Sequence, residues 1–401
     1  MRSDPRGAIV IGAGPGGLAA AAALRARGVD VLVFERAETI ASSWRGHYDR
    51  LHLHTPRELS GLPGMAIPRR LGRWVSRDGV VEYLELYAAH HDLEIRTGTT
   101  VRRLQRPGLD WEVHLEGGEV LLARDVVVAT GYNNTPAMPH WPGDDTFTGQ
   151  IVHASAYRNG APYAGRDVLV VGMGNTGAEI ATDLTEHGAA SVRIAVRTPP
   201  YILHRDRWWF PTANLAGIAV RRLPVRLVDL LQDTVLARDL PDLRAFGLPR
   251  ARGGIYSQVL RGTIPVQDVG IVAAIRDGRV QPVAAPARFG PDHVELTDGT
   301  RLEPAAVIVA AGYTRALEPL VGHLGVLDAG GNPRVCGGTE ALPGLWFTGF
   351  TNPISGMFRE LSRDGLAIAR SISRRGRQMV KTPNEVPYPY GGPFDRTPRA
   401  L

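Results

Sequence analysis

Short apolar runs along the chain each end in a glycine-rich turn, and this pattern predicts alternating strands and helices. The runs Ala8–Ile11 and Val168–Val171 are typical of buried strands. Small, helix-forming residues follow each turn, and the alanine-rich stretch 19–23 favours close packing of the first helix on a sheet. The pattern therefore predicts an α/β fold.

The remaining periodicity predicts further elements of the same kind. A helix is expected over 78–91, with Ser76 or Asp78 as its N-cap, and alternating strands over 94–123. Buried strands are expected in 125–132 and 306–313, two segments that read almost alike, followed by a strand at 344–350 and a helix over 356–373. Residues 37–75 are irregular, which in a compact domain is typical of a functional segment.

The two glycine-rich turns share one design. The first contains Gly12, Gly14, Pro15, Gly16 and Gly17, and the second Gly172, Gly174, Asn175, Thr176 and Gly177. A strand, a tight glycine turn and a helix N-terminus together bind the pyrophosphate of a dinucleotide. Two such loops in one chain indicate two dinucleotides side by side, an arrangement that commonly serves electron transfer between them.

The residues after the following strands distinguish the two sites. Glu35 lies 18 residues past Gly17, where a carboxylate meets ribose hydroxyls. Arg197 and Thr198 stand at the matching place in the second unit, where no acid is present. A guanidinium there suits the 2′-phosphate of NADP, so the second site is expected to prefer NADPH. The alternative for Glu35 and Arg197 is a solvated strand end.

The two loops set the expected domain organisation. We expect two Rossmann-like dinucleotide-binding domains of glutathione-reductase type, with an NADP domain inserted into an FAD domain. The predicted limits are 1–160 for the first part of the FAD domain, 161–290 for the NADP domain, and 291–401 for the second part and a C-terminal tail.

Composition narrows the function classes. The 401 residues are 44% hydrophobic and 21% charged, as in ordinary globular proteins, and no apolar run is long enough to span a membrane. Cys336 is the only cysteine, which excludes an intrachain dithiol and with it the disulfide reductases. The net charge of +6 comes almost wholly from arginine, with Lys381 the only lysine, so neither a nucleic-acid partner nor a lysine Schiff base is expected.

The sequence also bears on metals, location and membrane contact. No histidine or cysteine spacing suits a metal site, and we expect none. The beginning of the chain leaves no room for a signal peptide, so we expect a cytoplasmic protein. The amphipathic segment 208–240 is compatible with a packed helix, a substrate-side cover or, least of all, membrane contact. A homo-oligomer is compatible with the sequence.

The segment from Phe147 to Tyr157 carries the most specific motif. It fits the pattern F-x-G-x-x-x-H-x-x-x-Y, with Gly149 and His153 at the inner positions. This motif resembles that of the flavin-containing monooxygenases. Residues 40–57, 129–133, 263–270 and 349–351 resemble the YUCCA-type branch of that family, and Baeyer–Villiger enzymes typically end the motif in Trp.

The resemblance implies FAD and NADPH as cofactors, and molecular oxygen with a small organic substrate as reactants. It implies a C4a-(hydro)peroxyflavin that oxygenates the substrate, for example by oxidative decarboxylation of an aromatic 2-keto acid such as indole-3-pyruvate. N- or S-oxygenation, Baeyer–Villiger insertion and an electron-transfer reductase stay open as alternatives.

The resemblance also assigns site residues. His54 and Asn133 are the candidates for catalytic contacts near the flavin and nicotinamide, although a purely structural histidine is an equal alternative for His54. Further cofactor-binding candidates are Arg36, Trp44, Arg45, Ala129, Thr130, Gly131, Gly312, Gly349 and Phe350.

Overall fold

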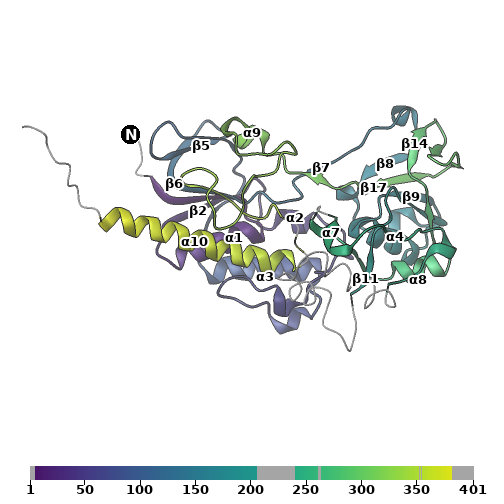
Figure 1. Ribbon diagram of the computed structural model, residues 1–401, viewed down its shortest axis with the longest axis horizontal. Coiled ribbons are helices and arrows are strands. Elements are labelled where there is room, and N and C mark those ends of the chain that lie inside the picture. Colours follow the sequence, from purple (N-terminus) through teal and green to yellow (C-terminus); the bar gives the residue numbers. More distant parts are fainter. Residues whose placement is uncertain (1–4, 206–239, 261–262, 352, 354, 382–401) are drawn as a thin grey trace, which may run out of the picture.

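The computed structural model has two lobes, each built on a parallel sheet (Figure 1). It describes residues 5–205, 240–260, 263–351, 353 and 355–381. The segment 208–240, apart from its last residue, lies outside the described residues.

The first lobe contains a seven-stranded sheet with the order β3-β2-β1-β6-β5-β4, and β19 also pairs with β6. Five strands run parallel: β1 (Arg6–Ile11), β2 (Val31–Phe34), β3 (Glu94–Arg96), β6 (Val120–Val128) and β19 (Leu345–Phe347). The strands β4 (Val101–Gln105) and β5 (Trp111–Leu115) are antiparallel additions. The sequence pattern predicts separate strands on either side of residue 124, whereas β6 is continuous through this position.

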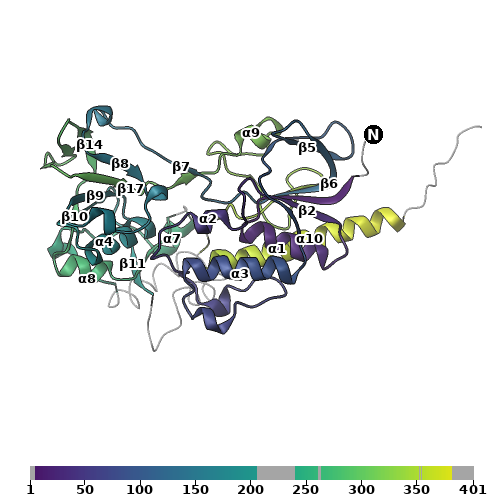
Figure 2. The ribbon, with the colours of Figure 1, turned by 180° about the vertical axis from the view of Figure 1, so that it is seen from behind.

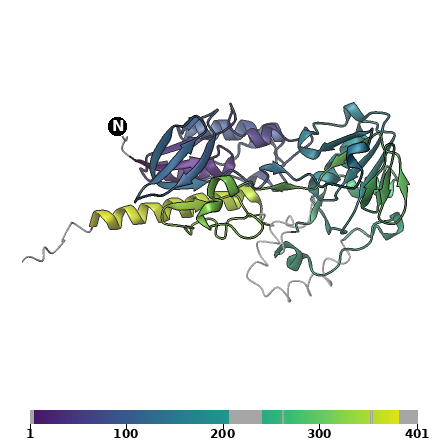
Figure 3. The same cartoon turned by 90° about the horizontal axis from the view of Figure 1, so that it is seen from above.

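Three helices cover one face of this sheet: α1 (Pro15–Arg25), α3 (Arg77–His90) and α10 (Met357–Lys381). Figures 2 and 3 show α10 lying along α1 and continuing beyond the sheet. The two helices approach closely because Gly365 has no side chain: a Cβ there would lie 2.9 Å from the carbonyl oxygen of Ala19. Ser76 caps α3 by accepting a hydrogen bond from the amide of Gly79 at 3.2 Å. The helix expected after the first glycine turn and those expected over 78–91 and 356–373 are confirmed as α1, α3 and α10.

The second lobe contains a five-stranded sheet with the order β13-β10-β9-β17-β8. All its pairings are parallel, between β8 (Gln150–His153), β9 (Asp167–Val171), β10 (Ser191–Ala195), β13 (Val280–Val283) and β17 (Ala306–Val309). On one face lie α4 (Asn175–Glu186) and α8 (Ile271–Arg276). The other face packs against a small antiparallel sheet of β14 (Pro286–Phe289), β15 (Val294–Leu296) and β16 (Arg301–Leu302).

The chain crosses between the lobes at a short antiparallel pair. The pair consists of β7 (Thr135–Pro136), which follows β6, and β18 (Tyr313–Thr314), which follows β17. The predicted α/β class is therefore confirmed. The predicted domain limits stay predictions, and β8 and β17 belong to the second sheet although they lie outside 161–290.

The remaining α-helices and strands of the described chain are shorter. They are α2 (Ser42–Arg45), α7 (Ile255–Leu260), α9 (Glu318–Val321), and the parallel pair β11 (Ile202–His204) and β12 (Val266–Asp268). None of the described helices combines the length and the apolar character needed to cross a lipid bilayer.

Candidate cofactor and active site

The first glycine loop joins β1 to α1, and three of its positions favour glycine for different physical reasons. Gly12 has φ +107°, and a Cβ there would lie 2.5 Å from the carbonyl oxygen of Ala129. A Cβ at Gly17 would lie 1.8 Å from the carbonyl oxygen of Gly12, so only glycine allows the helix to start this close to the strand. Gly14 differs, because a Cβ there would meet no described protein atom within 4 Å. That open space is where a phosphate can approach the backbone.

The second loop repeats this geometry at the junction of β9 and α4. Gly172 has φ +105°, and its Cβ would lie 2.7 Å from the carbonyl oxygen of Ala310. A Cβ at Gly177 would lie 1.9 Å from the carbonyl oxygen of Gly172, and a Cβ at Gly174 would meet no described atom within 4 Å. The two loops are thus equivalent backbone cradles at the N-termini of two helices.

The strand-end residues differ between the two sites. The Glu35 carboxylate accepts hydrogen bonds from the amide of Ala13 at 2.9 Å and the amide of Ala37 at 3.0 Å, which fix it beside the first loop. The Ser42 hydroxyl donates to the same carboxylate at 3.2 Å. A carboxylate has about four acceptor sites, so these three bonds leave capacity for one ribose hydroxyl. Arg197 follows β10, is exposed, and forms no ion pair with any described residue. Its charge is therefore available to a phosphate.

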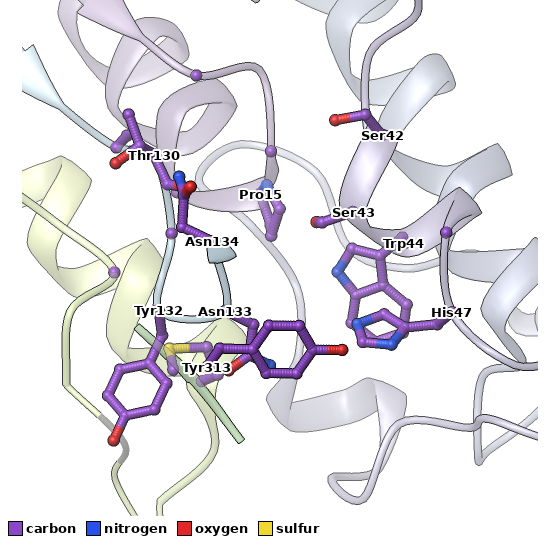
Figure 4. Close-up of a pocket in the computed structure, with 18 of the residues that line it drawn as sticks. Pro15, Ser42, Ser43, Trp44, His47, Thr130, Tyr132, Asn133, Asn134 and Tyr313 are labelled. Atoms are coloured by element: carbon purple, nitrogen blue, oxygen red, sulfur yellow. The ribbon is translucent and has the colours of Figure 1, made fainter. Parts of the chain in front are cut away.

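One cavity of about 1030 Å³ extends from the first loop to the start of α4. Figure 4 shows two of its walls, with Tyr132, Asn133 and Tyr313 on one side and Ser43, Trp44 and His47 on the other. Its volume lies at the upper end of the usual range for ligand sites, as a dinucleotide requires. The first-loop cradle, the fixed Glu35 and the cavity together fit FAD.

Most of the residues predicted to bind the first dinucleotide line the cavity. Its lining includes Gly12, Gly14, Pro15, Gly16, Glu35, Arg36, Trp44, Ala129, Thr130, Gly131, Gly349, His54 and Asn133, with Asn175 and Thr176 from the second loop. The other candidates do not line it: Gly17, Arg45, Gly172, Gly174, Gly177, Arg197, Thr198, Gly312 and Phe350. Arg45 is ion-paired with Glu85, and Phe350 is buried in the core beneath the sheet. The assignment of these residues to cofactor binding stays a prediction.

The segment 46–54 joins the two lobes at this cavity. It leaves the first lobe after α2, yet Tyr48 is buried within the hydrophobic core of the second lobe, and Leu51 packs against that core. Arg50 pairs with Glu186 on α4 at 2.7 Å. His54 Nε2 lies 2.9 Å from Oε1 of Glu179, also on α4. Glu179 was not expected from the sequence, where the only signal was a charged residue one turn after Thr176.

The motif Phe147–Tyr157 connects the linker to the second sheet. The Phe147 ring packs edge-on against Phe289, and a Cβ at Gly149 would lie 2.5 Å from that Phe147 ring. His153 Nε2 lies 3.0 Å from the carbonyl oxygen of Gly312, beyond β17. The Tyr157 hydroxyl donates to Asp183 of α4 at 2.6 Å. These contacts give every fixed position of the motif a structural role.

Burial shifts the ionisation of several groups around the cavity. It lowers the pKa of His47, and the nearby Arg158 guanidinium lowers it further, so neutral imidazole is favoured there. Burial, together with the neighbouring Glu179, raises the pKa of Tyr48 well above its usual value. Away from the cavity lining, burial raises the pKa of Cys336 to about 12, which leaves that thiol unreactive.

Comparison with known proteins agrees with this geometry. Residues 9–207 match a family model described as Pyridine nucleotide-disulphide oxidoreductase. The chain is 41% identical over 311 residues to Indole-3-pyruvate monooxygenase YUCCA1 of Oryza sativa subsp. japonica, covering 77% of this chain and 76% of the relative. It is 35% identical over 392 residues to Probable indole-3-pyruvate monooxygenase YUCCA7 of Arabidopsis thaliana, covering 94% and 90%.

A solved structure shows the same architecture. The Flavin-containing monooxygenase from Stenotrophomonas maltophilia superposes with a TM-score of 0.69 at 25% identity, covering 93% of this chain and 100% of the other. The predicted family resemblance is confirmed by these matches. The chain therefore belongs to the flavin monooxygenase family, together with the YUCCA-type indole-3-pyruvate monooxygenases.

Proposed function

We propose that this flavin monooxygenase converts an aromatic 2-keto acid, such as indole-3-pyruvate, to the acid one carbon shorter. The observation that carries the proposal is the 41% identity to a relative named as an indole-3-pyruvate monooxygenase. The balanced reaction consumes one keto acid, O₂, NADPH and a proton, and yields the shorter acid, carbon dioxide, water and NADP⁺. The bond between the keto carbon and the carboxyl carbon breaks, and one oxygen atom enters the product.

The two cradles divide the cofactors between them in this proposal. The first loop and Glu35 hold FAD, while the second loop and Arg197 hold NADPH. Bound together, these cofactors supply hydride transfer to the flavin and the activation of O₂. The protein contributes binding, orientation and exclusion of water, which agrees with a cavity that has no pair of acids arranged for general acid–base catalysis among its described lining residues.

The cavity walls suit an aromatic, anionic substrate. Trp44, Tyr132 and Tyr313 contribute aromatic rings to the lining, and the Arg315 guanidinium covers one face of the Tyr132 ring. Aromatic rings pack favourably in offset or edge-on arrangements. Arg158 also lines the cavity, is exposed, and has no ion-pair partner among the described residues. Its guanidinium suits a carboxylate, or equally a phosphate of NADPH.

In this proposal, His54 and Asn133 contact the bound molecules at the reacting centre. Both line the cavity, and an imidazole or a carboxamide can donate or accept one hydrogen bond at a defined position. The proposed role is to orient a bound polar group, because the cofactors supply the reactive chemistry.

Product analysis tests the proposal. The FAD-loaded protein is incubated with NADPH, ¹⁸O₂ and indole-3-pyruvate, phenylpyruvate, cyclohexanone or methyl phenyl sulfide. Catalase must be present, because hydrogen peroxide alone decarboxylates keto acids. Singly labelled indole-3-acetate or phenylacetate formed in step with NADPH oxidation is expected. A lactone or sulfoxide as the only coupled product would favour Baeyer–Villiger or S-oxygenating activity instead.

A further inference from the structure

Glu179 is a buried acid at the face of α4 that meets the first lobe. Its side chain is only 3% exposed. Within the part of the chain that the structure describes, no arginine or lysine lies within ion-pair distance of it, and its one partner able to carry a positive charge is His54. Burying a carboxylate costs free energy unless neighbouring groups stabilise it, so the side chains around Glu179 show how this cost is offset.

Two side chains of the segment 46–54 reach this carboxylate from the other lobe. His54 Nε2 lies 2.9 Å from Glu179 Oε1. Burial and the nearby Glu179 carboxylate raise the pKa of the Tyr48 hydroxyl. Thr176 lies one turn before Glu179 on α4. Thr176 itself lines the cofactor cavity. The N-terminal turns of α4 therefore touch both the cavity and the flavin-side segment.

The His54 contact is close, but it does not meet hydrogen-bond geometry: Nε2 lies 2.9 Å from Glu179 Oε1, and this oxygen has no hydrogen-bond partner among the described residues. A carboxylate oxygen only accepts hydrogen bonds, so the contact is favourable with a proton on Nε2 and unfavourable with a bare lone pair there. Nδ1 is the other polar site of the ring. Nδ1 has no hydrogen-bond partner among the described residues.

We propose that Glu179 is a positioning residue that sets the ring orientation and proton position of His54 from the NADP-binding lobe. This inference rests on the proposed role of His54 beside the cofactors. Because α4 begins at the second dinucleotide loop, a nucleotide bound there and the state of His54 are coupled. Such coupling is reciprocal, so altering His54 or Glu179 changes the affinity for NADP⁺.

The test uses the FAD-loaded, full-length protein labelled with ¹⁵N-histidine. The ring signals of His54 are assigned by their loss in the variant His54→Gln. In Glu179→Gln, the His54 ring nitrogens are expected to shift towards those of an unconstrained imidazole, and the Kd for NADP⁺ is expected to rise roughly fivefold or more. The double variant should bind NADP⁺ no more weakly than the weaker single variant, because both changes break one contact.

Glu186→Gln is the matched control. It removes an acid from the same helix that pairs with Arg50 of the same segment, but at the surface. The His54 signals and the Kd for NADP⁺ should stay within twofold of the unaltered protein. Equal effects of Glu186→Gln and Glu179→Gln would overturn the proposal, since they would indicate only a looser joint between the lobes.

Two further outcomes would contradict the positioning role of Glu179. Unchanged His54 signals in Glu179→Gln would show that the carboxylate does not set the ring. If this variant folds poorly, Glu179→Asp is used instead, because it keeps the charge but moves it away from His54 by one methylene. Unchanged His54 signals in Glu179→Asp would also contradict the proposal. None of these measurements contains a keto acid, so failure of the proposed reaction leaves them interpretable.

Discussion

Replacing Arg197 with alanine is expected to weaken NADPH binding and to leave NADH almost unaffected. Arg197 lies two residues beyond the end of β10, is exposed, and has no carboxylate of a described residue within ion-pair distance. The substitution therefore breaks no described ion pair. Exposed substitutions of this kind usually change the free energy of unfolding by less than about 0.5 kcal/mol.

The size of the effect follows from the same exposure. Hydrogen bonds to a charged group contribute about 1.5–3 kcal/mol when well formed. Solvent screens an exposed guanidinium, so the lower end applies, and about 1.4 kcal/mol corresponds to roughly a tenfold rise in KM for NADPH. NADH lacks the 2′-phosphate, and its KM should change less than twofold.

Steady-state oxidation of each nucleotide by the FAD-loaded variant measures both values. Arg288→Ala is the control, because it removes the same charge from the outer strand β14 and should leave both KM values unchanged. Raising the ionic strength should narrow the difference between the unaltered protein and Arg197→Ala. An equal loss with NADPH and NADH would refute the 2′-phosphate role.

Two other substitutions test the cradle and the motif. Gly14→Val should give a folded protein without flavin, because its Cβ meets no described atom within 4 Å but occupies the space facing the phosphates; a yellow, fully loaded variant would contradict this placement. Tyr157→Phe should lower the free energy of unfolding by about 1–3 kcal/mol in urea, since it leaves the buried Asp183 carboxylate without its 2.6 Å donor; unchanged stability would show that the motif tyrosine does not hold the linker.

The sequence was sufficient to predict features that depend on short-range geometry. Gly17 and Gly177 are each required by the carbonyl oxygen of the glycine five residues earlier, and Gly12 and Gly172 have nearly the same positive φ. Likewise, Ser76 caps its helix through an amide only three residues later. Requirements of this kind involve residues close together in the chain, so they can be predicted from the sequence.

Features that depend on contacts between the lobes could not be predicted. The burial of Tyr48 in the core of the other lobe requires the segment 46–54 to cross the interface, and no local pattern specifies that crossing. The pairing of Glu179 with His54 joins residues 125 positions apart in the chain. The motif singled out His153 and Tyr157 in the sequence, but their partners, Gly312 and Asp183, became evident only in the structure.

Stopped-flow absorbance tests the central claim most directly. The NADPH-reduced protein is mixed with oxygenated buffer, first alone and then with indole-3-pyruvate. The proposed function predicts a long-lived species that absorbs between the oxidised and reduced flavin bands, and that decays faster when the keto acid is present. Immediate return to oxidised flavin under both conditions would contradict the proposed function and indicate a reductase that transfers electrons to another acceptor.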